Sequence, residues 1–297
     1  MAEAALQQRP RTREFRHRSP LGEWELICRE PDPRLRGYVR EYMGYVEGAT
    51  SFRRRREVPG LDIPIIINFG APFRLVTAHG EHVPARSAEY RTFVAGLWDA
   101  SALVESAGPA CSMQVNFTPI GARLVLGVPM RDLTNRGVEL EEVLGATART
   151  LAAQLSDAPD WERRFVLFES FVFSRLARAR SLPADVRHAW RALCDAKGLV
   201  RIRSLTSAAG CSPRHLIDQF REHIGLPPKT VARILRFNRV IRRLRSDRGD
   251  VPWATIAQDC GYYDQAHFNR DFREFAGSTP SEYLGRCLPD HGGLIGD

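Results

Sequence analysis

The stretch IAQDCGYYDQAHFNRDFREFAGSTP, residues 256–280, decides how the second half of this chain folds. It repeats an earlier stretch, LTSAAGCSPRHLIDQFREHIGLPP, at residues 205–228. The opening positions align at a spacing of 51 residues, and the later positions, from Leu216 with Phe268 onward, at a spacing of 52. The second copy therefore has one extra residue in its turn, and the chain contains two copies of one structural unit.

Each copy has the pattern of two helices separated by a tight turn. A glycine stands where each helix must end, and glycine accepts the positive φ of such a position. Ser212 before Pro213 marks one helix start, and the spacing of Thr279 and Glu282 is that of a capping box. The glycines are Gly210 and Gly261 after the first helix, and Gly225 and Gly277 after the second. The pattern predicts two helix-turn-helix units.

The second helix of each unit has an apolar pair at i and i+4, Leu216 with Phe220 and Phe268 with Phe272. These pairs pack inward, so the polar positions between them face solvent. Arginine, glutamine, asparagine and aspartate can each hydrogen-bond to base edges in the major groove. We predict a DNA-binding set of Arg214, His215, Asp218, Gln219 and Arg221 in the first unit and Gln265, His267, Asn269, Arg270 and Arg273 in the second. Asp218 has two interpretations, a contact to cytosine or a salt bridge with a neighbouring arginine.

The segment between the two units has helical spacing of its apolar residues, including Val231, Ile234 and Ile241. A helix over 228–245 would be about 27 Å long, at 1.5 Å per residue. Such a spacer could hold two reading helices about one turn of DNA apart, or roughly 34 Å. The duplication therefore indicates a chain that reads two successive major grooves.

The C-terminal region resembles the DNA-binding domain of the AraC/XylS family of transcriptional regulators, and residues 256–284 resemble that family's signature. The resemblance implies a seven-helix module that binds double-stranded DNA as a gene activator or repressor, with RNA polymerase as a further partner. The first half resembles the cupin-like sensing domains that precede this module. That likeness implies a barrel for a small-molecule effector, and a homodimer. The family often keeps a structural arginine at the position of Arg236.

The chain has a formal net charge of +8, and fifteen Lys or Arg against four Asp or Glu fall between residues 187 and 248. A local excess larger than the charge of the whole chain favours an acidic partner. The arginines of the spacer form either a solvated face or a set of phosphate contacts. Tyr262 and Tyr263 in the second turn either pack or contact phosphate through a hydroxyl.

The first half contains short β-branched or aromatic runs separated by Gly and Pro, which predict strands of a barrel or sandwich. Helical spacing is present at 33–46, 138–155 and 161–179, and the aromatic face of the last segment packs on the barrel or forms a dimer contact. Trp24, Phe73, Phe93 and Trp98 are either pocket-lining or structural aromatics. The strand runs are 62–70, 73–77, 92–98, 102–106 and 111–117.

The fold class that follows is α+β. We predict an N-terminal cupin-like β-barrel with helices and a C-terminal all-α domain in which a long helix joins two helix-turn-helix units. The expected organisation is a disordered basic segment at 1–20, a cupin-like sensing and dimerisation domain at 21–180, an AraC-type DNA-binding domain at 181–288 and a flexible tail at 289–297. The function we predict is sequence-specific, effector-responsive transcription regulation.

An enzyme is the alternative, in the form of a metal or small-molecule cupin enzyme tethered to DNA. His79 and His82 form HGEH, which either starts a metal site or lies in a surface loop. No GxSxG, HExxH, Walker A or GxGxxG motif is present, so we expect no enzymatic activity and no cofactor. The six cysteines show no CxxC pair, and Cys211 and Cys260 beside the two turns are the candidates for a thiol switch. No apolar run reaches the roughly 18 residues of a membrane helix, so we expect a cytoplasmic protein without membrane contact.

Overall fold

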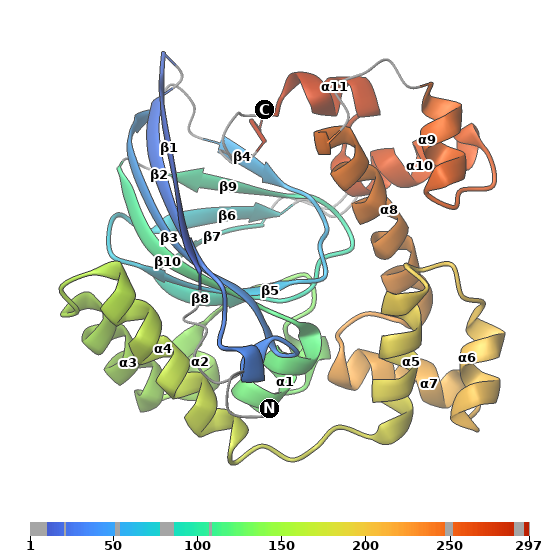
Figure 1. Ribbon diagram of the computed structural model, residues 1–297, viewed down its shortest axis with the longest axis horizontal. Helices are drawn as coiled ribbons and strands as arrows, with labels where there is room; N and C mark the ends of the chain where they lie inside the picture. Colours follow the sequence, from blue (N-terminus) through green and yellow to red (C-terminus); the bar gives the residue numbers. More distant parts are fainter. Residues whose placement is uncertain are drawn as a thin grey trace, which may run out of the picture.

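The computed structural model describes residues 11–20, 22–50, 54–77, 86–106, 109–246, 252–287 and 294–296. Two antiparallel sheets and the helices that cover one of them form the first half, and helices alone form the second half (Figure 1). The predicted α+β fold class is confirmed. Within the described residues, no helix has the length and apolar character needed to cross a membrane.

The larger sheet has seven strands in the order β1-β2-β3-β10-β5-β8-β11, and the smaller sheet has four in the order β4-β9-β6-β7. The seven are β1 (Thr12–Ser19), β2 (Gly22–Arg29), β3 (Val39–Thr50), β10 (Ala110–Phe117), β5 (Ile63–Asn68), β8 (Thr92–Ala95) and β11 (Gly137–Glu139). The four are β4 (Arg54–Glu57), β9 (Ala102–Ser106), β6 (Phe73–Thr77) and β7 (Arg86–Tyr90). All five predicted strand runs contain a strand, and the sequence analysis missed the other six.

Helices cover one face of the larger sheet. The longest of them, α4, begins after the cap Asp160 and places Phe165 and Phe168 in the core, where both rings approach Tyr42 at 6.1 and 6.4 Å between centroids. The aromatic face of this segment therefore packs on the sheet, and it is not available as a dimer contact. The elements of this layer are η2 (Pro33–Leu35), α1 (Pro119–Leu126), η3 (Met130–Asp132), α2 (Leu140–Leu144), α3 (Ala146–Ser156) and α4 (Trp161–Leu176).

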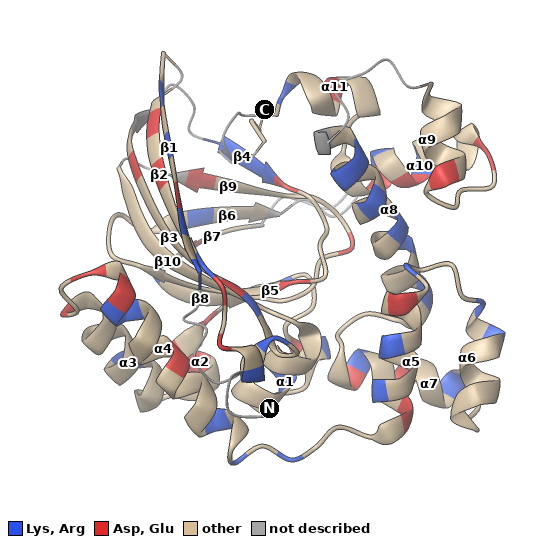
Figure 2. Ribbon diagram, viewed as in Figure 1, with Lys and Arg blue, Asp and Glu red and all other residues tan. Residues whose placement is uncertain are grey.

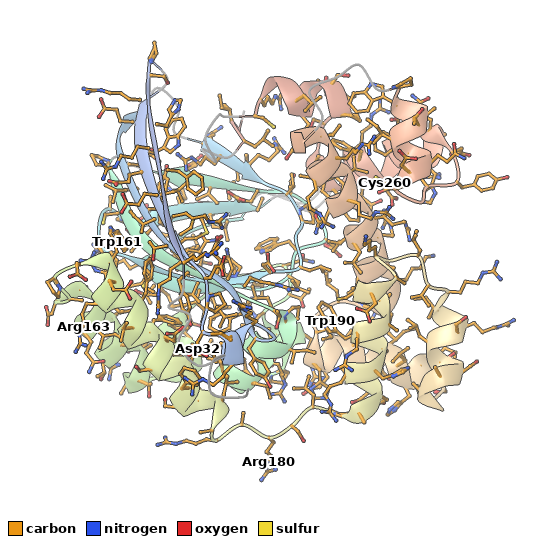
Figure 3. All side chains as sticks on the ribbon, in the orientation of Figure 1. Asp32, Trp161, Arg163, Arg180, Trp190 and Cys260 are labelled. Carbon is orange, nitrogen blue, oxygen red and sulfur yellow. The ribbon has the colours of Figure 1, made fainter. Side chains whose placement is uncertain are left out.

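The predicted helix over 33–46 is wrong. The chain forms one 3-10 turn and then enters β3, which hydrogen-bonds to β2 on one side and to β10 on the other. Gly44 allows α4 to pack closely on β3, because a Cβ at this position would lie 2.6 Å from the Trp161 ring of α4. Figure 3 shows Trp161 at the start of α4, against the sheet. Pairing with two distant strands overrides the local four-residue spacing. The predicted helix over 138–155 is also divided, because β11, α2 and α3 follow one another with a break at Gly145.

Both predicted disordered ends contain ordered residues. Residues 12–19 of the predicted segment 1–20 form β1, which pairs along its whole length with β2, while residues 1–10 lie outside the described part. In the predicted tail 289–297, Ile295 pairs with Arg55 of β4, and the side chain of Leu294 is buried. The sequence analysis missed both because each depends on an edge strand that the local sequence does not reveal.

Seven helices are present among the described residues of the second half, as the resemblance implied. They are α5 (Ala184–Asp195), α6 (Ile202–Ala209), α7 (Pro213–His223), α8 (Pro228–Ser246), α9 (Trp253–Asp259), α10 (Gln265–Ala276) and α11 (Pro280–Gly285). The long helix α8 runs between the first group, α5 to α7, and the second group, α9 to α11 (Figure 1). A segment at 177–183 without regular structure connects α4 to α5.

Among the described residues, two contacts between the halves involve backbone hydrogen bonds. At the first, Arg131 and Arg123 form ion pairs with Glu222 of α7, and the Thr134 hydroxyl donates to the Gly225 carbonyl at 2.9 Å. At the second, residues 294–296 follow α11 and return to β4, where Arg56 N donates to the Leu294 carbonyl at 2.8 Å. Each helix-turn-helix group therefore has its own connection to the first half.

Candidate nucleic-acid interface

The two helix-turn-helix units have the predicted turns and caps. The Ser212 hydroxyl accepts from His215 N at 3.2 Å, and Thr279 and Glu282 form the reciprocal capping box. Asp264 caps α10 by accepting from His267 N at 2.7 Å, a start signal that the sequence analysis did not use. The four glycines have positive φ, at 63° for Gly210, 106° for Gly225, 86° for Gly261 and 66° for Gly277.

Helices α7 and α10 present equivalent outward faces. Residues at i, i+4 and i+7 share one side of a helix. On α7 this side carries Arg214, Asp218 and Arg221, and the repeat spacing of 52 residues relates them to Ala266, Arg270 and Arg273 on α10. All six residues are exposed. Five of them are predicted DNA-binding residues, and the structure brings them together as three on one helix and two on the other.

The remaining predicted residues lie beside these faces or against the protein. His215 Nε2 lies 3.1 Å from the Asp185 carboxylate of α5, and the His267 ring packs edge-on against Tyr262. Gln219 and Asn269 are half-buried, while Gln265 is exposed in the first turn of α10. The two histidines are thus engaged within the domain.

Asp218 forms no ion pair with any residue in the described part of the chain. The salt-bridge interpretation of Asp218 therefore has no support, and its carboxylate is available to accept from an incoming donor.

The arginines of α8 hold the domain together. Arg233 hydrogen-bonds to Asp271 and Glu274 of α10, Arg236 donates to the Gly198 carbonyl at 2.9 Å, and Arg239 donates to the Asp259 carbonyl at 2.7 Å. The hydrogen bond to Glu274 is the main cause of a raised pKa for the Arg233 guanidinium. Lys and Arg run along α8 in Figure 2, and three of these arginines are committed to structural contacts. The expected structural role of Arg236 is seen directly.

The two tyrosines of the second turn, Tyr262 and Tyr263, have different environments. Tyr262 is buried, and its ring packs against Phe268 with 5.4 Å between centroids. Burial raises the pKa of its hydroxyl. Tyr263 is 94% exposed, which is unusual for so large an aromatic side chain. Packing therefore applies to Tyr262, and Tyr263 is placed for contact with a partner.

The first half holds a cavity of about 530 Å³ between its two sheets. Strand alternation builds it, because on β5 and β10 the buried apolar residues face the helices while their neighbours face the cavity. On β10 these neighbours are Ser112, Gln114 and Asn116. Phe73, Phe93 and Trp98 line the cavity as well, whereas Trp24 packs in a small cluster and stacks on His17.

One wall of the cavity contains an ion pair. Arg55 of β4 donates to Glu47 of β3 at 2.6 Å, and the Tyr45 hydroxyl also donates to Glu47. Glu47 is 5% exposed, and the pair links the two sheets. A mainly apolar cavity with a few placed polar groups is typical of small-molecule sites.

The metal-site hypothesis and the thiol-switch hypothesis have little support among the described residues. His79 and His82 lie outside the described residues, and within the described ones no group of three or more His, Cys, Asp or Glu could hold a metal ion. Cys260 is buried at the end of α9 (Figure 3), and burial is the main cause of a raised pKa there and at Cys211. A raised pKa reduces the thiolate fraction on which oxidation depends.

The second half of the chain is similar to known helix-turn-helix proteins. Residues 205–286 match a family described as a helix-turn-helix domain, and this range contains both units. A stretch of 99 residues is 32% identical to the F1 operon positive regulatory protein of Yersinia pestis, covering 33% of this chain and 32% of that one. A stretch of 86 residues is 29% identical to the arabinose operon regulatory protein of Escherichia coli, covering 29% of each chain. The C-terminal domain is a helix-turn-helix domain of the AraC type. The chain spans about a third of the length of the curated relatives it matches.

The other comparisons are a second family model and two solved structures. Residues 29–139 match a domain of unknown function, DUF6597, which covers most of the two sheets. The solved structure of ToxT from Vibrio cholerae has 12% identity and a TM-score of 0.43, covering 93% of this chain and 97% of that one. A probable AraC family transcriptional regulator from Rhodopseudomonas palustris has 28% identity and a TM-score of 0.32, covering 36% of this chain and 100% of that one.

Proposed function

We propose that this protein is a sequence-specific DNA-binding regulator of transcription. The observation that carries the proposal is the pair of equivalent exposed faces on α7 and α10, joined by the 19-residue helix α8. At 1.5 Å per residue, α8 is about 28 Å long, close to the roughly 34 Å of one DNA turn. The similarity of the AraC-type domain to two operon regulatory proteins supports the same function.

Each reading helix enters one of two successive major grooves. Arg214 and Arg221 on α7 and Arg270 and Arg273 on α10 donate to guanine, and Asp218 accepts from the cytosine amino group. Gln265 and Asn269 lie at the edge of the second face, within reach of adenine. His215, His267 and Gln219 support the helices that carry these contacts. Tyr263 donates its hydroxyl to a phosphate and so fixes the register of α10.

The cavity between the sheets receives a small-molecule effector. The effector controls DNA binding because each helix-turn-helix group is attached to the first half, through Glu222 to α1 and η3 at one end and through Leu294 to β4 at the other. A ligand that binds one arrangement of the two halves more tightly shifts the population toward it. No observation favours the cupin-type enzyme.

The proposal also covers the cellular location, the protein partners and the absence of catalysis. The protein acts in the cytoplasm, where its DNA lies, and contacts RNA polymerase as an activator or blocks it as a repressor. It acts as a homodimer through a surface other than the aromatic face of α4. It carries out no chemical step on its effector.

Selection of bound duplexes from a random DNA pool tests the proposal. Full-length protein at near-physiological salt is expected to enrich two short sequence blocks about ten base pairs apart, one for each reading helix. Enrichment of one block would assign sequence reading to a single unit. Binding without any sequence preference, with and without cell extract as a source of effector, would refute the function.

A further inference from the structure

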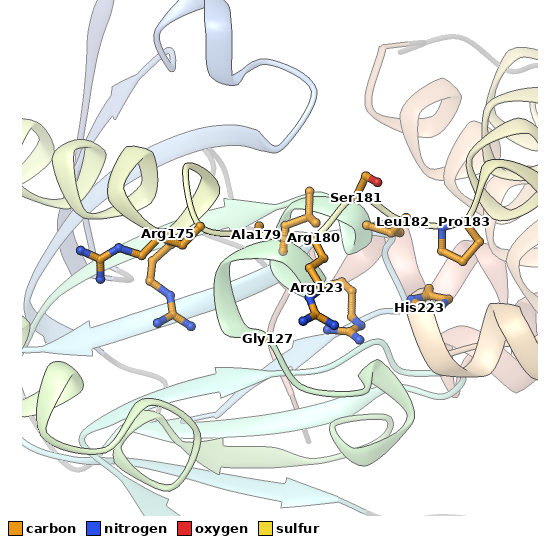
Figure 4. Close-up of a pocket in the computed structure, with 11 residues that line it drawn as sticks. Arg123, Gly127, Arg175, Ala179, Arg180, Ser181, Leu182, Pro183 and His223 are labelled. Atoms are coloured by element: carbon orange, nitrogen blue, oxygen red, sulfur yellow. The ribbon is translucent and has the colours of Figure 1, made fainter.

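A second pocket, of about 550 Å³, lies where the two halves of the protein meet. Its walls come from α1, the end of α4, the connecting segment and α7, so both domains contribute (Figure 4). The lining residues are Arg123, Leu124, Gly127, Arg175, Arg178, Ala179, Arg180, Ser181, Leu182, Pro183 and His223. The cavity between the sheets shares none of these residues.

The lining is strongly basic. It contains four arginines and one histidine, and no aspartate or glutamate among the described residues that line it. Arg123 extends from α1 and Arg180 from the connecting segment toward the same part of the pocket (Figure 4). Neither Arg178 nor Arg180 forms an ion pair within the described part of the chain, and both are exposed. Like charges that line one pocket repel one another, and a bound anion reduces that repulsion.

Two buried nitrogen atoms of the pocket have no hydrogen-bond partner. Arg123 Nε and His223 Nδ1 are inaccessible to solvent and make no hydrogen bond. Such atoms are uncommon in folded proteins and indicate an absent partner. Arg175, in contrast, has a structural task, because its Nε donates to the Val125 carbonyl at 2.7 Å at the end of α1. Glu222 offers Arg123 only a long contact, at 3.8 Å.

DNA seated on the reading face of α7 does not reach this pocket. Helix positions advance by about 100° per residue, so His223 lies about 180° around α7 from Arg214. The pocket therefore lies behind the reading helix, between α7 and the helices α1 and α4. Its shape and position suit a small ligand instead of a nucleic-acid backbone.

We propose that this pocket binds a small, multiply charged anion, such as a phosphorylated or polycarboxylate metabolite. Arg178 and Arg180 attract the anion, and Arg123 and His223 hold it between the two domains. The anion thereby fixes α7 against the sensing half. Its effect on DNA binding rests on the proposed function, whereas the binding of the anion does not.

Calorimetric titration of full-length protein with pyrophosphate, and separately with citrate, tests the proposal at constant ionic strength. We expect saturable binding of at least one probe with one site per chain. The double variant Arg178→Gln/Arg180→Gln is expected to weaken that binding by at least about tenfold, because charge-assisted contacts are lost. The matched control is Arg136→Gln/Arg163→Gln, which removes two exposed arginines outside the pocket and should bind as the unmodified protein does.

Three results would overturn the proposal. The first is the absence of saturable binding of either probe, and the second is equal weakening in both double variants. The third is unchanged anion binding in Arg178→Gln/Arg180→Gln together with weaker binding of duplex DNA, which would make these arginines contacts to the DNA backbone. Titration of the anion without DNA separates these results from a failure of the regulator function.

Discussion

Arg233 of α8 and Asp271 of α10 are joined by two hydrogen bonds, from Nε at 3.3 Å and from Nη2 at 2.8 Å, to one carboxylate oxygen. The Asp271 side chain is 4% exposed, and its other oxygen has no hydrogen-bond partner. The same guanidinium reaches Glu274 one turn further along α10. This contact fixes the orientation of the second reading helix, α10, relative to the spacer helix, α8.

Asp271→Asn should therefore destabilise the DNA-binding domain. Removing one partner of a buried pair costs about 3–5 kcal/mol, and because Arg233 keeps Glu274 we expect about 2–3 kcal/mol in the free energy of unfolding. Urea unfolding followed by circular dichroism measures it. Glu274→Gln is the control, with an expected cost within about 1 kcal/mol, since this carboxylate is half exposed. Equal stability of the two variants would contradict the structural role of Asp271.

Arg270→Ala should relax sequence preference at one base-pair position in one selected block. A bidentate contact to guanine contributes about 1–3 kcal/mol of discrimination, while a phosphate contact contributes none. Repeating the duplex selection with the variant measures this change. Arg163→Ala, at an exposed position of α4, is the control and should leave the preference intact. Uniformly weaker binding to every sequence would instead make Arg270 a phosphate contact.

Tyr263→Phe should weaken binding to specific and random duplexes alike, by a few-fold, because it removes one neutral hydrogen bond. Fluorescence anisotropy with two labelled duplexes measures it. Tyr262→Phe is the matched control one residue away. The Tyr262 hydroxyl is buried without a hydrogen-bond partner, so its removal should leave DNA affinity unchanged and leave the melting temperature equal or higher. An unchanged affinity in Tyr263→Phe would remove the phosphate contact from the proposal.

The free energy of unfolding should fall in mild acid because protonation of His223 favours the unfolded chain. Burial, and next the charge of Arg123, lower the pKa of this imidazole below its ordinary value, while Glu222 and Asp185 oppose the shift. The unfolded chain therefore binds the proton first, so stability is full above about pH 6.5 and falls as the pH drops toward the lowered folded-state pKa.

Melting temperatures across that pH range, in a buffer without multivalent anions, test the role of His223. His223→Gln should reduce the pH dependence, and His188→Gln, which changes an exposed histidine on α5, should not. The same acid sensitivity in all three proteins would show that other groups cause it.

Leu294→Asp should release the chain end from β4. The residue is 4% exposed, so a carboxylate placed there loses most of its contact with water. We expect a lower melting temperature and faster proteolysis after α11. Leu284→Asp, on an exposed position of α11, is the control and should behave as the unmodified protein. Equal proteolysis of both variants would mean that the end segment does not join the two halves.

The local sequence was sufficient wherever a short stretch carries its own signals. Glycines at the four helix ends, the caps at Ser212 and Thr279, and the apolar pairs of α7 and α10 predicted the helix-turn-helix units and their outward arginines. Helix periodicity and capping act within a few residues, so one sequence contains them. The repeat then showed that these signals describe the same unit twice.

Tertiary structure alone decided the features that join distant residues. The segment at 33–46 became mainly strand because β2 and β10 bond to it from both sides. Three arginines of α8, Arg233, Arg236 and Arg239, proved structural because Asp271, Gly198 and Asp259 lie opposite them. The separation of Tyr262 from Tyr263, and the meeting of Arg123 with His223 in one pocket, likewise depend on packing. The sequence determined the two DNA-binding units through local backbone preferences, whereas contacts between residues far apart in the chain decided which side chains remain available to a partner.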